Sequence, residues 1–219
     1  MRGSVWCSGW ICLFLTFKII GMKHLILASR SPRRKALLTE AGLTFQVRSV
    51  DTEERFPEDM PVGEVAAYIA KGKAEALWQT LSSEQQAQSI ILASDTIVVL
   101  GSTVLGKPKD TDEAKAFLQL LSGRKHEVIT GVCLWSVAGQ HQFSVKTNVY
   151  FRPLTDEQIA YYVRQYKPFD KAGAYAIQEW MGMVGIEKIE GDYYNVVGLP
   201  VAAVLAALKS FCPELEGLI

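Results

Sequence analysis

Cysteine and histidine are scarce in this chain of 219 residues, which contains four cysteines and three histidines. Cys7, Cys12, Cys133 and Cys212 show none of the paired spacings that are typical of zinc sites. We therefore expect neither a zinc site nor a disulfide framework. Because cysteines without such a framework suit a reducing compartment, we expect the protein in the cytoplasm.

An excess of charge is missing as well, because 23 basic and 23 acidic side chains give a formal net charge of zero. Proteins that bind nucleic acid or anionic membranes through a broad surface usually carry a basic excess. We therefore expect neither as a partner, and any phosphate site has to arise from a local cluster of cations. The sequence also lacks a Walker-type loop and a recognisable Ser/His/Asp arrangement, which argues against P-loop and nucleophilic chemistry.

The N-terminal segment lacks the length of a membrane-spanning helix. Its apolar stretch from Trp10 to Phe17 follows Arg2 and resembles the core of a signal peptide. However, Lys18 interrupts it, it is shorter than the ~20 residues that span a bilayer, and no small-x-small cleavage site follows. Met22 would make a natural start immediately before the first strand. We therefore expect residues 1–21 to be a disordered extension or the product of a start assigned too early.

Helices and strands are predicted to alternate along the rest of the chain, which is typical of an α/β fold. We find no internal repeat and no low-complexity linker, so residues 22–211 are expected to form one domain and residues 212–219 a tail. Residues 82–88 are polar, and the glycine-rich stretch 167–200 gives no clear pattern. The expected strands span 24–29, 45–50, 89–100, 126–137 and 141–152, and the expected helices span 32–41, 62–81, 111–122, 155–166 and 201–211.

Hydroxyl and guanidinium groups gather in the turn Ala-Ser-Arg-Ser-Pro-Arg-Arg over residues 28–34, between the first strand and helix. Ser31 is a good N-cap, and Pro32 suits the first helical position. The free N–H groups of the helix start then lie beside Arg33 and Arg34, where a phosphate or carboxylate would be bound well. Taken alone, these residues fit a capped helix with solvated arginines equally well.

A polar triplet, Ser94-Asp95-Thr96, interrupts the otherwise apolar run 89–100. A carboxylate in such surroundings is costly unless a partner or a function accounts for it. Backbone N–H groups at a strand end could satisfy Asp95. Alternatively, Asp95 is a general base or a metal ligand in a cleft, with cations nearby.

Other polar positions give weaker signals. Lys107 lies between glycine and proline, on a turn that could aim its ammonium at a ligand. Lys71 and Lys73 fall inside an expected helix, where lysines usually form a solvated face. His126 stands alone in a turn, so a structural role is more typical of it than a catalytic one.

Six segments of the sequence occur in this order: Ala-Ser-Arg-Ser-Pro-Arg-Arg (28–34), Ser-Asp-Thr (94–96), Gly-Lys-Pro (106–108), Ser-Gly-Arg-Lys-His-Glu-Val-Ile-Thr-Gly-Val (122–132), Asp-Lys-Ala-Gly-Ala-Tyr-Ala-Ile-Gln (170–178) and Ile-Glu-Gly-Asp-Tyr-Tyr-Asn-Val-Val-Gly-Leu-Pro (189–200). In these segments and their order the chain resembles Maf proteins, which are nucleoside triphosphate pyrophosphatases also called septum formation inhibitors. The resemblance covers about residues 22–210. It implies a two-lobed mixed-sheet α/β fold with a deep central cleft, similar to the inosine triphosphatase (Maf/Ham1) fold.

The reaction implied by this resemblance is hydrolysis of a nucleoside triphosphate to the monophosphate and pyrophosphate, assisted by a divalent cation, Mg²⁺ or Mn²⁺. Asp95 matches the proton acceptor of the family. Glu54 matches an acid of the family that could help Asp95 to hold the metal. Because Glu53 precedes it, the match could also fall on Glu53. The residues that match phosphate-binding groups are Ser29, Ser31, Arg34, Lys73 and Lys107, together with Arg33.

The resemblance also indicates which nucleotide base the protein selects. Gln178, Arg33 and Thr96 match the specificity positions of a branch that acts on dTTP and UTP, where a glutamine reads the base. Alternatively, Gln178 is a loop residue facing water, the protein acts on 7-methyl-GTP, or it is a nucleotide-binding regulator of septum formation without turnover. Many relatives have glycine after this glutamine, whereas Glu179 follows it here.

Two further expectations accompany the resemblance. Trp180 would either stack on a base or pack against the protein. A homodimer is compatible with the family, although no apolar stripe in the sequence marks an interface.

Overall fold

The computed structural model describes residues 23–213 and residue 215. The expectation for residues 1–21 lies outside this range, as does most of the expected tail. The strands are β1 (His24–Leu27), β2 (Phe45–Val47), β3 (Ser89–Leu100), β4 (Thr103–Leu105), β5 (Lys125–Ser136), β6 (Gly139–Phe151) and β7 (Ile186–Glu190). The helices are α1 (Pro32–Glu40), α2 (Val62–Gln79), α3 (Ser83–Gln88), α4 (Thr111–Leu121), α5 (Asp156–Tyr166), α6 (Trp180–Val184), α7 (Tyr193–Val197) and α8 (Val201–Phe211), with a 3₁₀ turn η1 (Ala172–Ala174).

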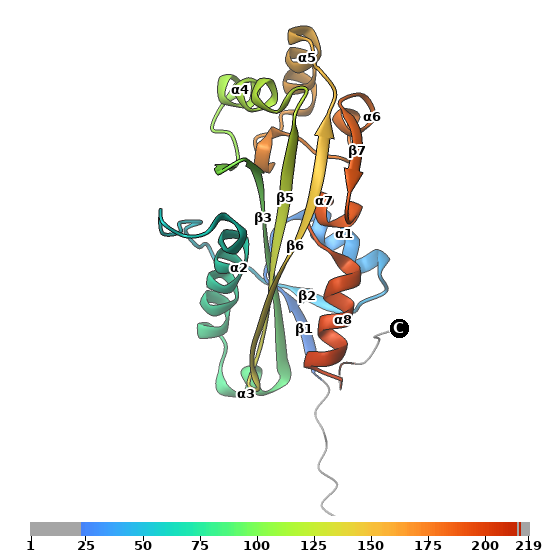
Figure 1. The fold of residues 1–219 in the computed structure, drawn as a ribbon. Coiled ribbons are helices and arrows are strands. Elements are labelled where there is room, and N and C mark those ends of the chain that lie inside the picture. The colour runs from blue at the N-terminus through green and yellow to red at the C-terminus, as the bar shows by residue number, and fades with distance from the viewer. Residues whose placement is uncertain (1–22, 214, 216–219) are drawn as a thin grey trace, which may run out of the picture.

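The strands form one seven-stranded mixed sheet in the order β2-β1-β3-β5-β6-β7, with β4 paired to β3. Strands β2, β1 and β3 run parallel to one another, whereas β3, β5, β6 and β7 pair antiparallel. The expected α/β class with a mixed sheet is therefore confirmed. In Figure 1 the long strands β3, β5 and β6 cross the whole molecule and carry helices at both ends.

The two faces of the sheet bury different helices, because side chains alternate along a strand. On one face of β3, Ile91 and Ala93 pack against α2. On the other face, Ile90 and Leu92 belong to the cluster that includes α1 and α8. Figure 1 accordingly shows α2 and α8 on opposite sides of the central strands.

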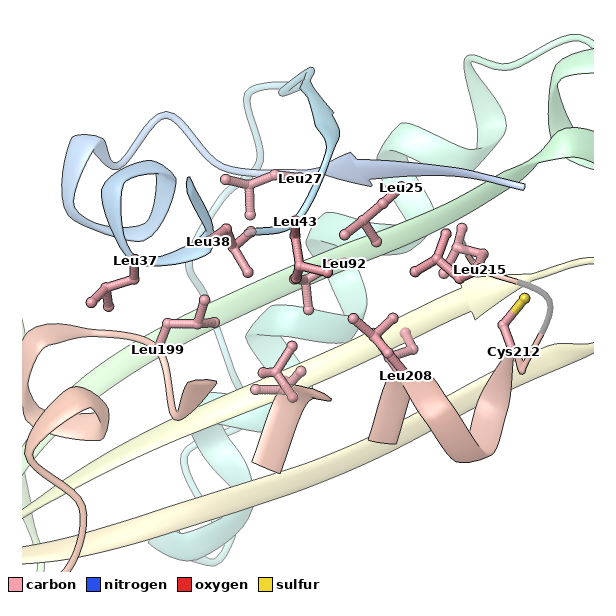
Figure 2. Close-up of a cluster of buried hydrophobic side chains, with 14 residues drawn as sticks. Leu25, Leu27, Leu37, Leu38, Leu43, Leu92, Leu199, Leu208, Cys212 and Leu215 are labelled. Carbon is pink, nitrogen blue, oxygen red and sulfur yellow. The ribbon is translucent and has the colours of Figure 1, made fainter. Parts of the chain in front are cut away.

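Two apolar clusters lie at opposite ends of the long strands. Figure 2 shows the first, in which Leu37 and Leu38 of α1 and Leu208 of α8 gather with Leu25 and Leu92 of the sheet. Cys212 and Leu215, which follow α8, are buried in the same cluster. The second cluster joins α4 and α5 to the far halves of β3, β5 and β6. The polar triplet of β3 falls between the two clusters.

Local sequence signals account for most helix ends. Ser31 caps α1 by accepting a hydrogen bond from the Arg34 N–H, and Pro32 is the first helical residue. Thr155 and Gln158 form a reciprocal capping box at the start of α5. Gly42 adopts a left-handed φ of 76° shortly after the end of α1.

Several boundaries differ from the expectation. The first strand ends at Leu27 and the second at Val47, earlier than expected. The next residue of each still donates one hydrogen bond to the neighbouring strand, Ala28 N–H to the Leu92 carbonyl oxygen and Arg48 N–H to the Leu27 carbonyl oxygen. The polar stretch 82–88 contains α3, a helix that the sequence did not predict. This helix buries no side chain, so it lacks the apolar periodicity that reveals longer helices.

The glycine-rich stretch 167–200, left without an assigned element, contains η1, α6, β7 and α7. At the start of α4, the carboxylate of Asp110 accepts from the N–H groups of Asp112 and Glu113, whereas that of Glu113 accepts from Lys109 N–H. The helix is therefore capped without a reciprocal box. In the described part of the chain, no helix is long and apolar enough to cross a membrane.

Candidate active site

A cavity of about 390 Å³ opens where β1 ends, beside the middle of β3. On this edge, β3 pairs with β1 up to Leu92 and with β4 from Val98 onward. Within the described residues no strand pairs with positions 93–97 on this side. The gap leaves Asp95 and Thr96 facing the cavity.

Lys73 of α2 links two acids across the cavity. Its Nζ lies 2.6 Å from Asp95 Oδ1 and 2.8 Å from Glu54 Oε1. Asp95 is only 7% exposed, so its charge requires a partner of this kind. In the described part of the chain, Asp95 Oδ2 has no hydrogen-bond partner and stays available to a ligand or a water molecule.

Glu54 extends this chain of charges to Lys107. Both of its carboxylate oxygens accept hydrogen bonds from Lys107 Nζ, at 3.0 and 2.9 Å. Partial burial would raise the pKa of Glu54, but hydrogen bonds from Lys73 and Lys107 outweigh it and bring the pKa to about 2. Glu54 is therefore ionised at neutral pH. Glu53, the alternative at this position, pairs with Arg55 on the surface.

Arg34 of α1 is a further cation that lines the cavity. Its guanidinium donates to the Gly198 carbonyl oxygen at 2.8 Å, to Thr96 Oγ1 at 3.0 Å and to Ser29 Oγ at 3.3 Å. Burial lowers the pKa of Arg34, while the nearby carboxylate of Asp95 opposes this effect. An anion bound here would compensate for the lost hydration of the guanidinium.

A buried hydrogen-bond network supports Thr96 from behind. Its hydroxyl lies 2.9 Å from Thr130 Oγ1, which donates to the Asn195 carbonyl oxygen at 3.0 Å. The Asn195 amide in turn donates to the Val128 carbonyl oxygen and to Thr147 Oγ1. The side chain of Thr96 is thereby fixed between the network and Arg34.

Arg33 points to a second set of charges at the other end of the cavity. Its Nη1 lies 2.9 Å from Asp170 Oδ2, and Lys171 Nζ lies 2.8 Å from Asp170 Oδ1. Burial would raise the pKa of Asp170, but these two hydrogen bonds lower it below its usual value. This end of the cavity also has apolar walls, and Gln178 is exposed at its rim. The apolar residues that line the cavity here include Val98, Val128, Tyr175, Ala176 and Val196.

Comparison with known protein families shows which family the chain belongs to. The model described as "Maf: Maf-like protein" matches residues 24–211. The chain belongs to the Maf family. The expected family is therefore confirmed, and the match spans every element of the described structure.

Relatives of this Maf protein share much of its sequence. A protein of Cytophaga hutchinsonii named "dTTP/UTP pyrophosphatase" is 48% identical over 193 residues, which cover 88% of this chain and 86% of the relative. A protein of Phocaeicola vulgatus with the same name is 47% identical over 186 residues, covering 84% and 94% respectively. Among solved structures, the Staphylococcus aureus Ham1 protein aligns with 59% of this chain and 72% of its own, at 14% identity and a TM-score of 0.43.

The candidate catalytic, phosphate-binding, metal-binding and specificity residues of this Maf protein all line the same cavity. They come from the β1–α1 turn, the first turn of α1, the loop before α2, α2 itself, β3, the turn after β4 and the segment after η1, so they converge only in three dimensions. These residues are Ser29, Ser31, Arg33, Arg34, Glu54, Lys73, Asp95, Thr96, Lys107 and Gln178.

The structure also adds residues that the sequence did not single out. Asp170 and Lys171 line the cavity, and Lys171 is only 7% exposed. A buried lysine is a strong signal once burial is known, but in a glycine-rich segment without periodicity it resembles a surface residue. Trp180 packs on Tyr161 and Tyr162 and does not line the cavity. His126 is buried against Tyr175 and has the structural role that we expected.

The acids of this Maf protein suit a hard cation. No cluster of three or more His, Cys, Asp or Glu side chains that could hold a metal occurs within residues 23–213. Glu54 and Asp95, however, face one cavity and share the ammonium of Lys73. Mg²⁺ is commonly held by one or two carboxylates together with the phosphates of a substrate, and this pair fits that pattern.

Proposed function

We propose that this protein hydrolyses dTTP and UTP to the nucleoside monophosphate and pyrophosphate. The observation that carries the proposal is the position of Asp95, a buried carboxylate in a cavity lined by several cations, with one oxygen that no described residue engages. Relatives that are 47–48% identical over most of the chain carry the name dTTP/UTP pyrophosphatase. A binding protein without turnover would not need an available carboxylate oxygen at this point.

The cations of the cavity would bind the triphosphate. Arg34 presents a guanidinium fork already oriented by Thr96 and Gly198, and the α1 N-terminus adds backbone N–H groups. Arg33, Lys73 and Lys107 are paired with acids in the free protein. A triphosphate would replace part of this pairing, so it enters a site whose charges are already positioned.

Asp95 would act on the attacking water. A water molecule bound to Asp95 Oδ2 gives its proton to the carboxylate while its oxygen attacks the α-phosphorus. The bond from the α-phosphorus to the bridging oxygen breaks, and pyrophosphate leaves with the electron pair of that bond. Lys107 and Lys73 would stabilise the charge on the leaving group.

Glu54 and Asp95 are the residues that would hold a divalent cation, Mg²⁺ or Mn²⁺. When bound, the cation would neutralise phosphate charge in the transition state. Lys73 would then serve two purposes, since it keeps both carboxylates in position and contributes its own charge.

Gln178 would read the base at the apolar end of the cavity. Its carboxamide can accept from N3–H and donate to O4 of uracil or thymine. Cytosine exchanges these partners and would leave polar groups unpaired, which disfavours it. Because Cys133 and Cys212 are free thiols, which suit a reducing compartment, we also propose the cytoplasm as the location of the protein.

A panel of nucleotides tests this function. Pyrophosphate release from dTTP, UTP, CTP, dATP, GTP and 7-methyl-GTP is measured with Mg²⁺ on the full chain, with Asp95→Asn as the inactive control. We expect turnover of dTTP and UTP that is lost in the control. Turnover of 7-methyl-GTP alone would overturn the base preference, and tight binding without any turnover would overturn the enzymatic function.

A further inference from the structure

A short turn carries Gln178 at the apolar end of the cavity. Its ends are Ala176 and Glu179, and the Glu179 N–H donates to the Ala176 carbonyl oxygen at 3.3 Å. The next turn follows at once, because the Gly182 N–H donates to the Glu179 carbonyl oxygen at 3.0 Å. A Cβ on Gly182 would lie 1.7 Å from the carbonyl oxygen of Ile177, so the two turns pack against each other without spare room.

Both ends of this turn are bound to a single hydroxyl group from α5. Tyr162 OH donates to Glu179 Oε2 at 2.7 Å and accepts from the Ala176 N–H at 3.1 Å. Tyr162 is fully buried. Its ring stacks on Tyr166 and on Trp180, so the hydroxyl has a fixed position.

The other oxygen of Glu179 faces a buried lysine. Lys171 Nζ lies 3.4 Å from Glu179 Oε1 and 2.8 Å from Asp170 Oδ1, and the Lys171 side chain is 8% exposed. Asp170 in turn accepts from Arg33. A continuous chain of charges therefore joins Arg33, which faces the bound phosphates in the proposed function, to the turn that carries Gln178.

Gln178 itself has no hydrogen-bond partner among the described residues. Its side chain is exposed, so neighbouring groups do not fix its direction. The backbone of the turn therefore sets where the carboxamide reaches and how closely it can approach a bound base, which determines how strongly it binds the preferred one.

We propose that Glu179 and Tyr162 are positioning residues for base selection, which fix the turn of Gln178. The inference rests on the proposed function. It adds that a residue which never touches the nucleotide decides how strictly uracil is preferred to cytosine.

Binding of non-hydrolysable nucleotides tests this inference apart from turnover. The affinities of α,β-methylene-UTP and α,β-methylene-CTP are measured by calorimetry. The ratio of the first affinity to the second gives the preference for uracil over cytosine. Glu179→Ala should lower the preference about tenfold by weakening the UTP analogue alone. Glu179→Gln keeps an acceptor for Tyr162 and should retain most of the preference. Glu187→Gln, on the exposed part of β7, is the matched control and should leave it unchanged.

A double variant shows whether Glu179 acts through Gln178. If it does, Gln178→Ala combined with Glu179→Ala should lose no more preference than Gln178→Ala alone. Additive losses would overturn the inference, as would a Glu179→Ala protein that keeps the full preference or that weakens both analogues equally. A wild-type protein that binds both analogues equally well would also overturn it.

The proposed function is judged separately by turnover of the wild-type protein. Absence of pyrophosphate release from dTTP and UTP, with an intact binding preference, would overturn the proposed function and leave the positioning role standing. Tyr162→Phe is a second test of how the turn is held, since it removes only the hydroxyl group that bonds to both ends of the turn. It should lower the preference as Glu179→Ala does.

Discussion

The ammonium of Lys73 lies 2.6 Å from Asp95 Oδ1 and 2.8 Å from Glu54 Oε1, so one lysine of α2 positions both acids of the cavity. Asp95 comes from the central strand and Glu54 from a loop before α2. Without the lysine, two carboxylates would face each other across the cavity and repel.

Lys73→Met should therefore lower kcat/KM for UTP by about 10²-fold or more, since a buried charge and the position of two acids are lost together. Lys71→Met is the matched control, because Lys71 lies on the same helix but faces a different surface hollow, beside Phe143. Steady-state kinetics and circular dichroism measure the two effects. A folded Lys73→Met protein with near-normal kinetics would contradict the assigned position of the site.

The close approach of α2 to the sheet depends on Gly131 of β5. A Cβ at this position would lie 2.1 Å from the backbone nitrogen of Ala67 in α2. Gly131→Ala should destabilise the protein by about 3 kcal/mol, because the helix has to move away. Activity should fall in parallel, since α2 carries Lys73.

Gly72→Ala provides the comparison for this prediction. Gly72 lies in α2, the helix that packs on Gly131, and a Cβ added to Gly72 would meet no atom within 4 Å. The alanine should raise stability by up to about 1 kcal/mol, through helix propensity alone. Urea unfolding of both variants gives the two free energies, and equal stabilities would contradict the packing described.

His126 makes stability depend on pH. Its ring lies between Phe151 and Tyr175, and its Nε2 is 2.7 Å from Tyr175 OH. Burial lowers the pKa of His126 to about 4. Below about pH 6.5 the unfolded chain binds a proton that the folded protein excludes, so this residue costs stability as the pH falls, by up to about 3 kcal/mol at pH 4.

His126→Phe should remove this contribution. The difference in unfolding free energy between pH 7.5 and pH 4.5, measured with urea, should be smaller in the variant than in the wild type. Because only the change with pH is compared, a constant loss from the unpaired Tyr175 hydroxyl cancels. An unchanged pH dependence would show that His126 is accessible to protons in the folded state.

The sequence predicted β1, β2, β3, β5 and β6 and the polar interruption of β3, because these follow from local patterns, whereas it assigned neither β4 nor β7. The apolar run around Asp95 marks a buried strand, and the capping residues Ser31 and Thr155 mark helix starts. The six-residue helix α3 escaped prediction because it packs no apolar face. The expected ends of β1 and β2 were too long for a different reason, since propensity alone does not show where regular pairing between strands stops.

The candidate residues were found through motifs, whereas their mutual contacts were not. Arg33 and Asp170 are separated by 137 positions along the chain, and no local signal links them. Lys171 and Glu179 appear as ordinary charged residues until their burial and their shared partner are known. The base-selecting turn is therefore the part of the site that only the structure reveals.

Hydrolysis of UTP in ¹⁸O-labelled water by the wild type and by Asp95→Asn is the sharpest test of the role of Asp95. We expect release of pyrophosphate with the label in UMP, because water attacks the α-phosphorus. We also expect at least about a 10²-fold lower rate for Asp95→Asn, with an unchanged fold. Label in the released phosphates, or an Asp95→Asn protein with near-normal turnover, would contradict the assignment of Asp95 and its cavity.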